Sequence, residues 1–279
     1  MKHMNYLLIA MTSCFLIASC KKNEARKKNV ESFLSQKDLS LPSHKLSTYS
    51  RILNSKYLLV FEAGLGDDHS VWPENELIKV IRDQSDLLTY DRAGYGTSGL
   101  GPGPRNIATL SAELEKVIDA FSGQKKVILI GHSIGGMIIR DYAIKHPSKT
   151  AALLFIDPSH EHYNQPSGEE EDRIYNIFNN SYGAGFGGTR EARVLIEDSR
   201  YMSTLATLPN IPVTVISSMK TDQEHPAADR KKWFEAHEFL GTGLNDFMHI
   251  STVNSGHYIM KEEPDLIIRN INSLLAKLP

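Results

Sequence analysis

The sequence predicts an α/β domain with a mostly parallel central sheet and helices on both faces. Short, continuous apolar runs, typical of strands buried on both faces, recur along the chain, and segments with helical apolar spacing separate them. Strands that alternate with helices build βαβ units, whose strands lie parallel. Ligands of such sheets bind beyond the carboxyl ends of the strands, so the turns after the strands are the places to search for chemistry.

The expected elements follow one another from about residue 45 onward. Strands are expected at 57–61, 86–90, 126–130, 151–156, 213–216 and 247–253, and helices at 110–121, between 130 and Pro147, and at 263–278. Residues 158–209 show no strand pattern, but they contain an acidic run and a helix-like piece at 173–178. A long insertion after a strand is more often a lid than a plain loop, so we expect a small helical cap there.

The N-terminus has the character of an export signal. Lys2 precedes an apolar run over 5–18, which is shorter than the roughly 20 residues that a membrane-spanning helix needs. The run ends in Leu-Ile-Ala-Ser before Cys20, a pattern that looks like a bacterial lipobox, where cleavage precedes an acylated cysteine. We therefore expect a signal peptide over 1–19, a lipidated Cys20, a polar tether over 20–44 and the folded domain over 45–279. An ordinary cleaved signal peptide, with Cys20 incidental, is the alternative.

Charge and cysteine content narrow the partners and the location. The net charge of −2 argues against nucleic acid, because phosphate binding relies on a clear basic excess. The two cysteines are Cys14, which leaves with the signal peptide, and Cys20, so the fold needs no disulfide. We expect a protein of the bacterial cell envelope that contacts a membrane through its N-terminal lipid anchor. The sequence makes no prediction of oligomeric state.

A Gly-x-Ser-x-Gly motif marks the turn after the strand at 126–130. Gly131-His132-Ser133-Ile134-Gly135 is entered by a strand pattern and left by a helical one, the setting that a nucleophile elbow requires. The turn is tight, and a Cβ at either glycine would clash with the neighbouring strand and helix. Such a turn presents the Ser133 hydroxyl at the sheet edge. A strand–helix turn without catalysis is the alternative.

Together with this motif, further segments resemble the α/β-hydrolase family over nearly all of residues 45–278. They occur in the family's order and spacing, and they are Phe61-Glu62-Ala63-Gly64-Leu65-Gly66, Trp72, Tyr90-Asp91-Arg92-Ala93-Gly94-Tyr95-Gly96-Thr97-Ser98, and Ser255-Gly256-His257 followed by Pro264. The resemblance implies Ser133 as nucleophile and His257 as its general base, since a serine needs a base of suitable pKa near neutral pH. A surface-loop histidine is the alternative for His257.

The resemblance also implies an oxyanion hole and a triad acid. The backbone N–H groups of Leu65 and Ile134 are expected to form the oxyanion hole, unless the glycine turn at 64–66 serves packing alone. Relatives usually begin this loop with His-Gly, whereas Glu62 stands here, and its role is open. Asp157 directly follows a strand and is favoured as the acid, with Asp222, in the loop after the next strand, as the alternative.

These expectations converge on acyl transfer to water, with a small-molecule acyl substrate, an ester above all, and no cofactor. A peptidase, a lactonase or a carbon–carbon bond hydrolase would use the same residues, and a non-catalytic ligand-binding surface lipoprotein is a rival of another class. No metal is expected, because His160-Glu161-His162 and Asp67-Asp68-His69 lack a distant matching set of ligands. Trp72, Tyr95 and Phe186 are expected in the core rather than in a pocket.

Overall fold

The structure is a computed structural model, and it describes residues 33–82 and 84–279. The signal peptide expected over 1–19 and the lipidation expected at Cys20 lie outside the described residues. None of the described helices combines the length and the apolar character that crossing a membrane requires.

An eight-stranded sheet forms the centre of the molecule, in the strand order β1-β2-β4-β3-β5-β6-β7-β8. The strands are β1 (Ser35–Ser40), β2 (Lys45–Arg51), β3 (Tyr57–Glu62), β4 (Asp86–Tyr90), β5 (Lys126–His132), β6 (Thr150–Ile156), β7 (Val213–Ser218) and β8 (Phe247–Thr252). Only β2 pairs antiparallel with its neighbours β1 and β4, and every other pairing is parallel. The carboxyl ends of β3, β5, β6, β7 and β8 are therefore aligned along one edge of the sheet.

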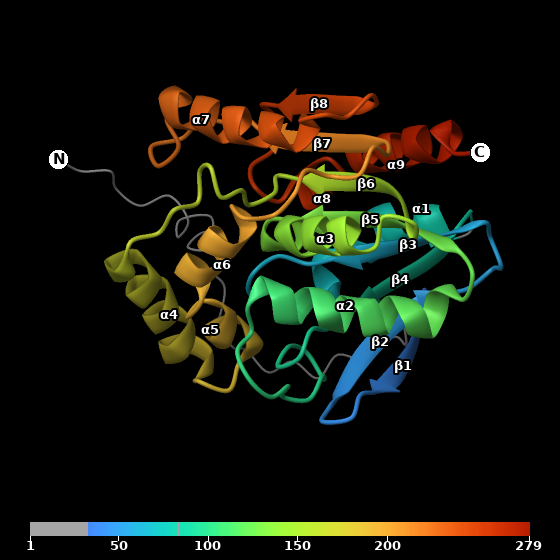
Figure 1. The fold of residues 1–279 in the computed structure, drawn as a ribbon, viewed down its shortest axis with the longest axis horizontal. Helices are drawn as coiled ribbons and strands as arrows, with labels where there is room; N and C mark the ends of the chain where they lie inside the picture. Colours follow the sequence, from blue (N-terminus) through green and yellow to red (C-terminus); the bar gives the residue numbers. More distant parts are fainter. Residues whose placement is uncertain (1–32, 83) are drawn as a thin grey trace, which may run out of the picture.

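Helices cover both faces of this sheet, as Figure 1 shows. The larger helices are α2 (Ile107–Ser122), α3 (Ile134–Lys145), α7 (Ala227–Glu238) and α9 (Pro264–Lys277), and the short ones are α1 (Lys79–Arg82) and α8 (Ile259–Glu262). Alternation along β3 divides the core, because Leu58 and Val60 pack with α2 and α3, whereas Leu59 and Phe61 pack with α9. Both faces of the strand are buried, which explains its continuous apolar run.

Three helices fill the segment between β6 and β7, which we call the inserted segment (residues 158–209). They are α4 (Gly168–Tyr182), α5 (Gly187–Glu191) and α6 (Leu195–Met202), and they lie together beyond one end of the sheet (Figure 1). Ile174, Phe178 and Met202 join the core cluster of α2 and α3, so the segment is packed onto the domain. The predicted fold class, including a small helical cap after the strand that follows Ser133, is confirmed.

The structure departs from the sequence prediction at the start of the domain. Residues 35–40, assigned to the tether over 20–44, form β1, and residues 45–51 form β2. The predicted tether is therefore too long. Almost all of β1 faces solvent, and β2 is rich in serine and threonine, so neither strand presents the apolar run of a buried parallel strand.

Candidate active site

Ser133 occupies a strained turn between β5 and α3. Its backbone φ and ψ are 54° and −126°, a conformation that residues other than glycine rarely adopt. Backbone bonds hold the turn, since Ser133 N donates to Ile156 O at 3.2 Å and Ser133 O accepts from Ser159 N at 2.9 Å. A Cβ on Gly135 would lie 2.4 Å from Glu62 O, so the turn can pass the end of β3 only with glycine there. The local geometry is that of the expected elbow.

His257 and Asp157 form a hydrogen-bonded pair beside this turn. His257 Nδ1 lies 2.7 Å from Asp157 Oδ2, although the two residues are far apart in the sequence. Asp157 directly follows β6 and its side chain is fully buried, while 21% of the His257 side chain is exposed. Because an ionised carboxylate can only accept, Nδ1 carries the proton, and Nε2 of the neutral ring is left free to accept one.

Two neutral donors fix the second oxygen of Asp157. Its Oδ1 accepts from Trp233 Nε1 at 2.6 Å and from Ser218 N at 2.8 Å. Burial works to raise the pKa of Asp157, but the bonds from His257 and Trp233 outweigh it and hold this pKa below its usual value. The carboxylate is therefore charged near neutral pH and cannot rotate without losing these bonds. Trp233 carries no motif, and sequence reasoning missed it.

Asp222, the alternative acid, lies elsewhere. Its Oδ1 accepts from His225 N at 2.7 Å and lies 3.0 Å from His225 Nδ1, and 54% of its side chain is exposed. His257 is bonded to Asp157 instead. The structure thus brings one of the two aspartates to His257, and the other closes a turn in the loop before α7.

A cavity joins the sequence-predicted residues. Leu65, Ser133, Ile134, Asp157 and His257 all line it. The Ser133 hydroxyl and the His257 ring share the cavity without a direct hydrogen bond, a looseness common in active sites before substrate binds. Among the described residues, the N–H groups of Leu65 and Ile134 have no acceptor. Unpartnered backbone donors in buried residues are rare, and the two residues that carry them here line the same cavity as the serine.

His132, the second residue of the elbow motif, supports the loop that carries His257. Its Nε2 lies 3.0 Å from the carbonyl oxygen of His257, and the two rings lie 4.5 Å apart. Burial above all, with the neighbouring His257, pulls the pKa of His132 well below its usual value. The ring is therefore neutral and donates to the His257 carbonyl. In the sequence, the only indication of this role is the position of His132 inside the elbow motif.

Glu62 belongs to a buried charge cluster rather than to the cavity. Arg92 Nη1 donates to Glu62 Oε1 at 2.9 Å, and Arg92 Nε and Nη2 donate to both oxygens of Glu191, at 2.9 and 3.0 Å. Tyr90 and Tyr95 complete the cluster, because their hydroxyls donate to Glu62 and Glu191, each at 2.7 Å. All five side chains are buried. Glu191 comes from α5, so the cluster ties the loop after β3 to the inserted segment.

The same cluster fixes the backbone of the loop that carries Leu65. Arg92 Nη1 donates to Ala63 O at 2.7 Å and Nη2 donates to Gly64 O at 2.8 Å. Gly66 N donates to the Tyr95 hydroxyl at 3.2 Å. The backbone is therefore fixed before Leu65, through the carbonyls of residues 63 and 64, and after it, through the amide of Gly66. Sequence reasoning could not find Glu191, which lies in a segment without a recognisable pattern.

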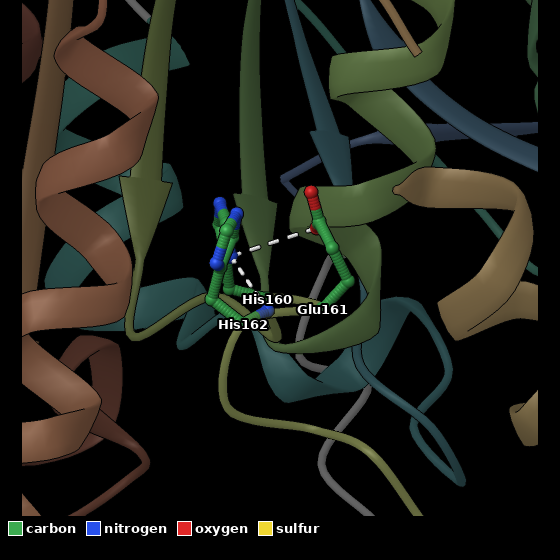
Figure 2. Close-up of side chains that lie close together, drawn as sticks. All are labelled: His160, Glu161 and His162. Carbon is green, nitrogen blue, oxygen red and sulfur yellow. Dashed lines mark hydrogen bonds and ion pairs between the residues drawn. The ribbon is translucent and has the colours of Figure 1, made fainter. Parts of the chain in front are cut away.

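Two groups of side chains that could ligate a metal ion already have hydrogen-bond partners within the protein. His160, Glu161 and His162 lie on one turn, as Figure 2 shows, and their ligand atoms lie within 4.8 Å of one another. Arg140 Nη1 donates to both oxygens of Glu161, at 2.9 and 2.8 Å, so a cation would compete with a guanidinium there. The second group is Asp68, His69 and Asp91.

In that second group the imidazole already has a carboxylate partner. His69 Nδ1 lies 2.7 Å from Asp91 Oδ1, and its ring stacks on Tyr49 with 3.5 Å between centroids. Tyr49 also donates through its hydroxyl to Asp91 Oδ2, at 3.2 Å. Both groups are therefore explained by hydrogen bonding and packing within the chain. The aromatic residues named from the sequence are packed similarly, with Trp72 and Tyr95 buried and Phe186 against the core.

Comparisons with known proteins agree with the fold. A family described as alpha/beta hydrolase fold matches residues 57–233. The chain is 24% identical over 236 residues to the uncharacterized protein YqjL of Bacillus subtilis, over 83% of this chain and 88% of YqjL. It is 30% identical over 114 residues to the (lyso)-N-acylphosphatidylethanolamine lipase of Homo sapiens, a match of 40% of this chain and 33% of the lipase.

A solved structure adds to these similarities. The thermophilic esterase from Thermogutta terrifontis is similar with a TM-score of 0.66 and 16% identity, over 87% of this chain and 98% of the esterase. At that identity the likeness shows the fold. The family match covers well over half of the chain, and it includes the elbow, Arg92 and Asp157. The chain therefore belongs to the α/β-hydrolase fold family and is a hydrolase.

Proposed function

We propose that the protein hydrolyses carboxylic esters through an acyl-enzyme on Ser133. The observation that carries this proposal is one cavity that contains a serine in a strained turn, a His–Asp pair and two unpartnered backbone amides. In this scheme His257 Nε2 removes the proton of Ser133 as the hydroxyl attacks the ester carbonyl, and returns it to the leaving alcohol. Water then attacks the acyl-enzyme with the same base, and the acid and Ser133 are released.

The proposal assigns one role to each part of the site. Asp157 orients His257 and stabilises the imidazolium that forms, since its carboxylate accepts from Nδ1. The N–H groups of Leu65 and Ile134 stabilise the negative charge on the carbonyl oxygen, which appears only in the tetrahedral state. A serine at the elbow favours acyl transfer over the alkyl-enzyme chemistry for which an aspartate is needed at this position. The similarity to a lipase supports an ester as the substrate.

A fluorophosphonate probe tests this proposal. We expect one adduct per chain, on Ser133, located by intact mass and peptide mapping. His257→Ala should slow labelling by several orders of magnitude, because the serine loses its base. Equal labelling of Ser133→Ala, or no labelling of folded protein, would remove the proposal. Esters, amides and lactones, offered in parallel to the labelled preparation, then separate an esterase from a peptidase or a lactonase.

We also propose that the mature protein begins at a lipidated Cys20 and is held on a membrane of the bacterial envelope. The support is the lipobox-like sequence before Cys20 and the apolar run that precedes it. Several acyl chains on one residue would anchor the protein stably, because a single chain binds only marginally. Mass spectrometry of the mature N-terminus tests this. An unmodified terminus at another residue would refute the anchor.

A further inference from the structure

Arg230 brings a positive charge to the wall of the active-site cavity. It lies on α7, lines the cavity together with Ser133 and His257, and is only 7% exposed. Trp233 lies three residues further along the same helix, and therefore on the same face, where it donates to Asp157. The helix that supports the acid thus also carries Arg230, about one turn away from that contact.

The guanidinium of Arg230 is held by one contact and has no acidic partner. Its Nε donates to Lys220 O at 2.8 Å, which fixes the side chain. No carboxylate of the described residues forms an ion pair with Arg230, and its two Nη groups have no partner there. The adjacent Asp229 forms no ion pair with Arg230, and its Oδ2 accepts from the Tyr163 hydroxyl at 2.6 Å. Two guanidinium nitrogens with all their donors are therefore left for a ligand.

None of the three acids that line the cavity, Asp67, Asp157 and Asp198, forms an ion pair with Arg230. Asp157 is bonded to His257 and to two neutral donors. Burial raises the pKa of Asp198 to about 8, so this carboxyl is largely neutral at pH 7. Burial likewise raises the pKa of Asp67, against the weaker effects of Lys261 and His257. Arg230 is the one arginine or lysine among the described residues that line the cavity, and no ion pair joins it to a carboxylate there.

We propose that the natural ester carries an anionic group, a carboxylate above all, and that Arg230 binds this group while Ser133 attacks the ester carbonyl. This inference rests on the proposed ester hydrolysis. A guanidinium matches a carboxylate with two parallel hydrogen bonds, and a buried site strengthens these bonds relative to water. The proposal thereby narrows the substrate class to esters with an acid function on the acyl or the alcohol side.

Two matched pairs of esters test the proposal and locate the charge. On the acyl side, p-nitrophenyl hydrogen glutarate is compared with its methyl ester. On the alcohol side, 4-acetoxybenzoate is compared with methyl 4-acetoxybenzoate. For at least one pair we expect the wild-type kcat/KM to favour the charged ester by about tenfold or more, the size of a charged hydrogen-bonded pair. Arg230→Gln should abolish this preference, measured within the variant as the ratio of kcat/KM for the charged ester to kcat/KM for its neutral partner.

Control variants separate charge at this position from charge in general and from misfolding. Lys231→Gln removes the same charge from the same helix at a side chain that is 74% exposed, and it should keep the preference. Arg230→Lys should retain part of the preference for the charged ester, since an ammonium keeps the positive charge but lacks the planar, two-pronged geometry of the guanidinium. Labelling by the fluorophosphonate counts the intact sites in every variant, so rates refer to folded enzyme.

The outcomes distinguish this inference from the proposed function. If both neutral and charged esters are hydrolysed equally, and Arg230→Gln changes neither, the inference is wrong while the esterase proposal stands. If no ester is hydrolysed, binding of glutarate to Ser133→Ala is measured by calorimetry. Binding that Arg230→Gln abolishes would then support the anion site alone, and equal binding by both proteins would overturn it.

Discussion

The two sides of the active-site cavity are held in place by different chemistry. On the acid–base side, one carboxylate, Asp157, accepts from a histidine, an indole and a backbone amide, all attached to the sheet or to α7. On the oxyanion side, Arg92 lies between two buried carboxylates and reaches the backbone of the loop after β3. One side relies on neutral donors around a single charge, and the other relies on a charge cluster.

This difference determines what a substitution does. The fixed hydrogen bonds around Asp157 place it at the end of β6, so a change there alters catalysis more than the fold. Breaking a buried ion pair leaves an uncompensated charge away from water. A change in the Arg92 cluster is therefore expected to affect both catalysis and the stability of the fold. The cluster also includes Glu191 of α5, and the inserted segment is therefore coupled to the loop that carries Leu65.

The largest effect is expected on the acid–base side. Asp157→Asn should lower kcat by about 10³- to 10⁴-fold, because the amide favours the wrong tautomer of His257. Asp222→Asn should leave kcat within about twofold, since Asp222 contacts His225 instead. Steady-state kinetics on an activated ester measure both. A loss confined to Asp222→Asn would reverse the assignment of the acid.

On the oxyanion side, Glu62→Gln should lower both stability and activity. The substitution removes one charge from the Arg92 cluster and should cost about 3 kcal/mol of unfolding free energy, as for other broken buried pairs. We expect kcat to fall by about 10- to 100-fold as the loop after β3 loosens. Urea denaturation and kinetics provide the two measurements.

The exposed Glu169 of α4 supplies the control for this prediction. Glu169→Gln should change neither the free energy of unfolding nor kcat. Wild-type stability in Glu62→Gln would show that the cluster does not hold the loop. The contrast between the two sides of the cavity would then be lost.

A smaller effect is expected when one neutral donor is removed from Asp157. Trp233→Phe keeps the aromatic packing and removes the Nε1 bond to Oδ1. We expect kcat to fall by about tenfold with KM nearly unchanged, because Ser218 N and His257 still hold the carboxylate. A raised KM with an unchanged kcat would instead place Trp233 in substrate binding.

The last prediction concerns the pH dependence of stability and Asp198, a buried acid of the inserted segment. Its pKa is raised to about 8 by burial, whereas an unfolded aspartate titrates near ~3.9. Between these values the folded state keeps a proton that the unfolded state releases, so stability falls as pH rises through this window.

Asp198→Asn removes that titration and keeps the oxygen that accepts from Ile107 N at 2.7 Å. Its advantage over the wild type should grow by up to about 1.4 kcal/mol per pH unit from pH ~4 to ~8. Urea midpoints at several pH values measure this difference. A constant difference across the range would contradict a raised pKa.

The sequence predicted the parts of this molecule that depend on local pattern. Buried parallel strands are continuous apolar runs, so β3 to β7 could be located from composition alone. The elbow at Ser133 could be found because its tight turn requires glycine at fixed spacing. The edge strand β1 and its polar neighbour β2 lack such a pattern and were missed.

Partners that depend on tertiary contact could not be read from the sequence. Arg92 stands in a motif, but its partner Glu191 is separated from it by the whole of β5, α3 and β6. The choice between Asp157 and Asp222 rested on distance from a strand end, and the carboxylate that reaches His257 is visible only in three dimensions. Long-range hydrogen bonds of this kind leave no periodic signal in a single chain.

The most direct test of the account is to trap its covalent intermediate. An activated ester is mixed with excess enzyme, the reaction is quenched in acid within milliseconds, and the intact mass is measured. We predict one acyl group per chain, mapped to Ser133, and none in Ser133→Ala. Turnover without any acyl adduct under conditions where release is slowed, or an adduct on another residue, would contradict the account.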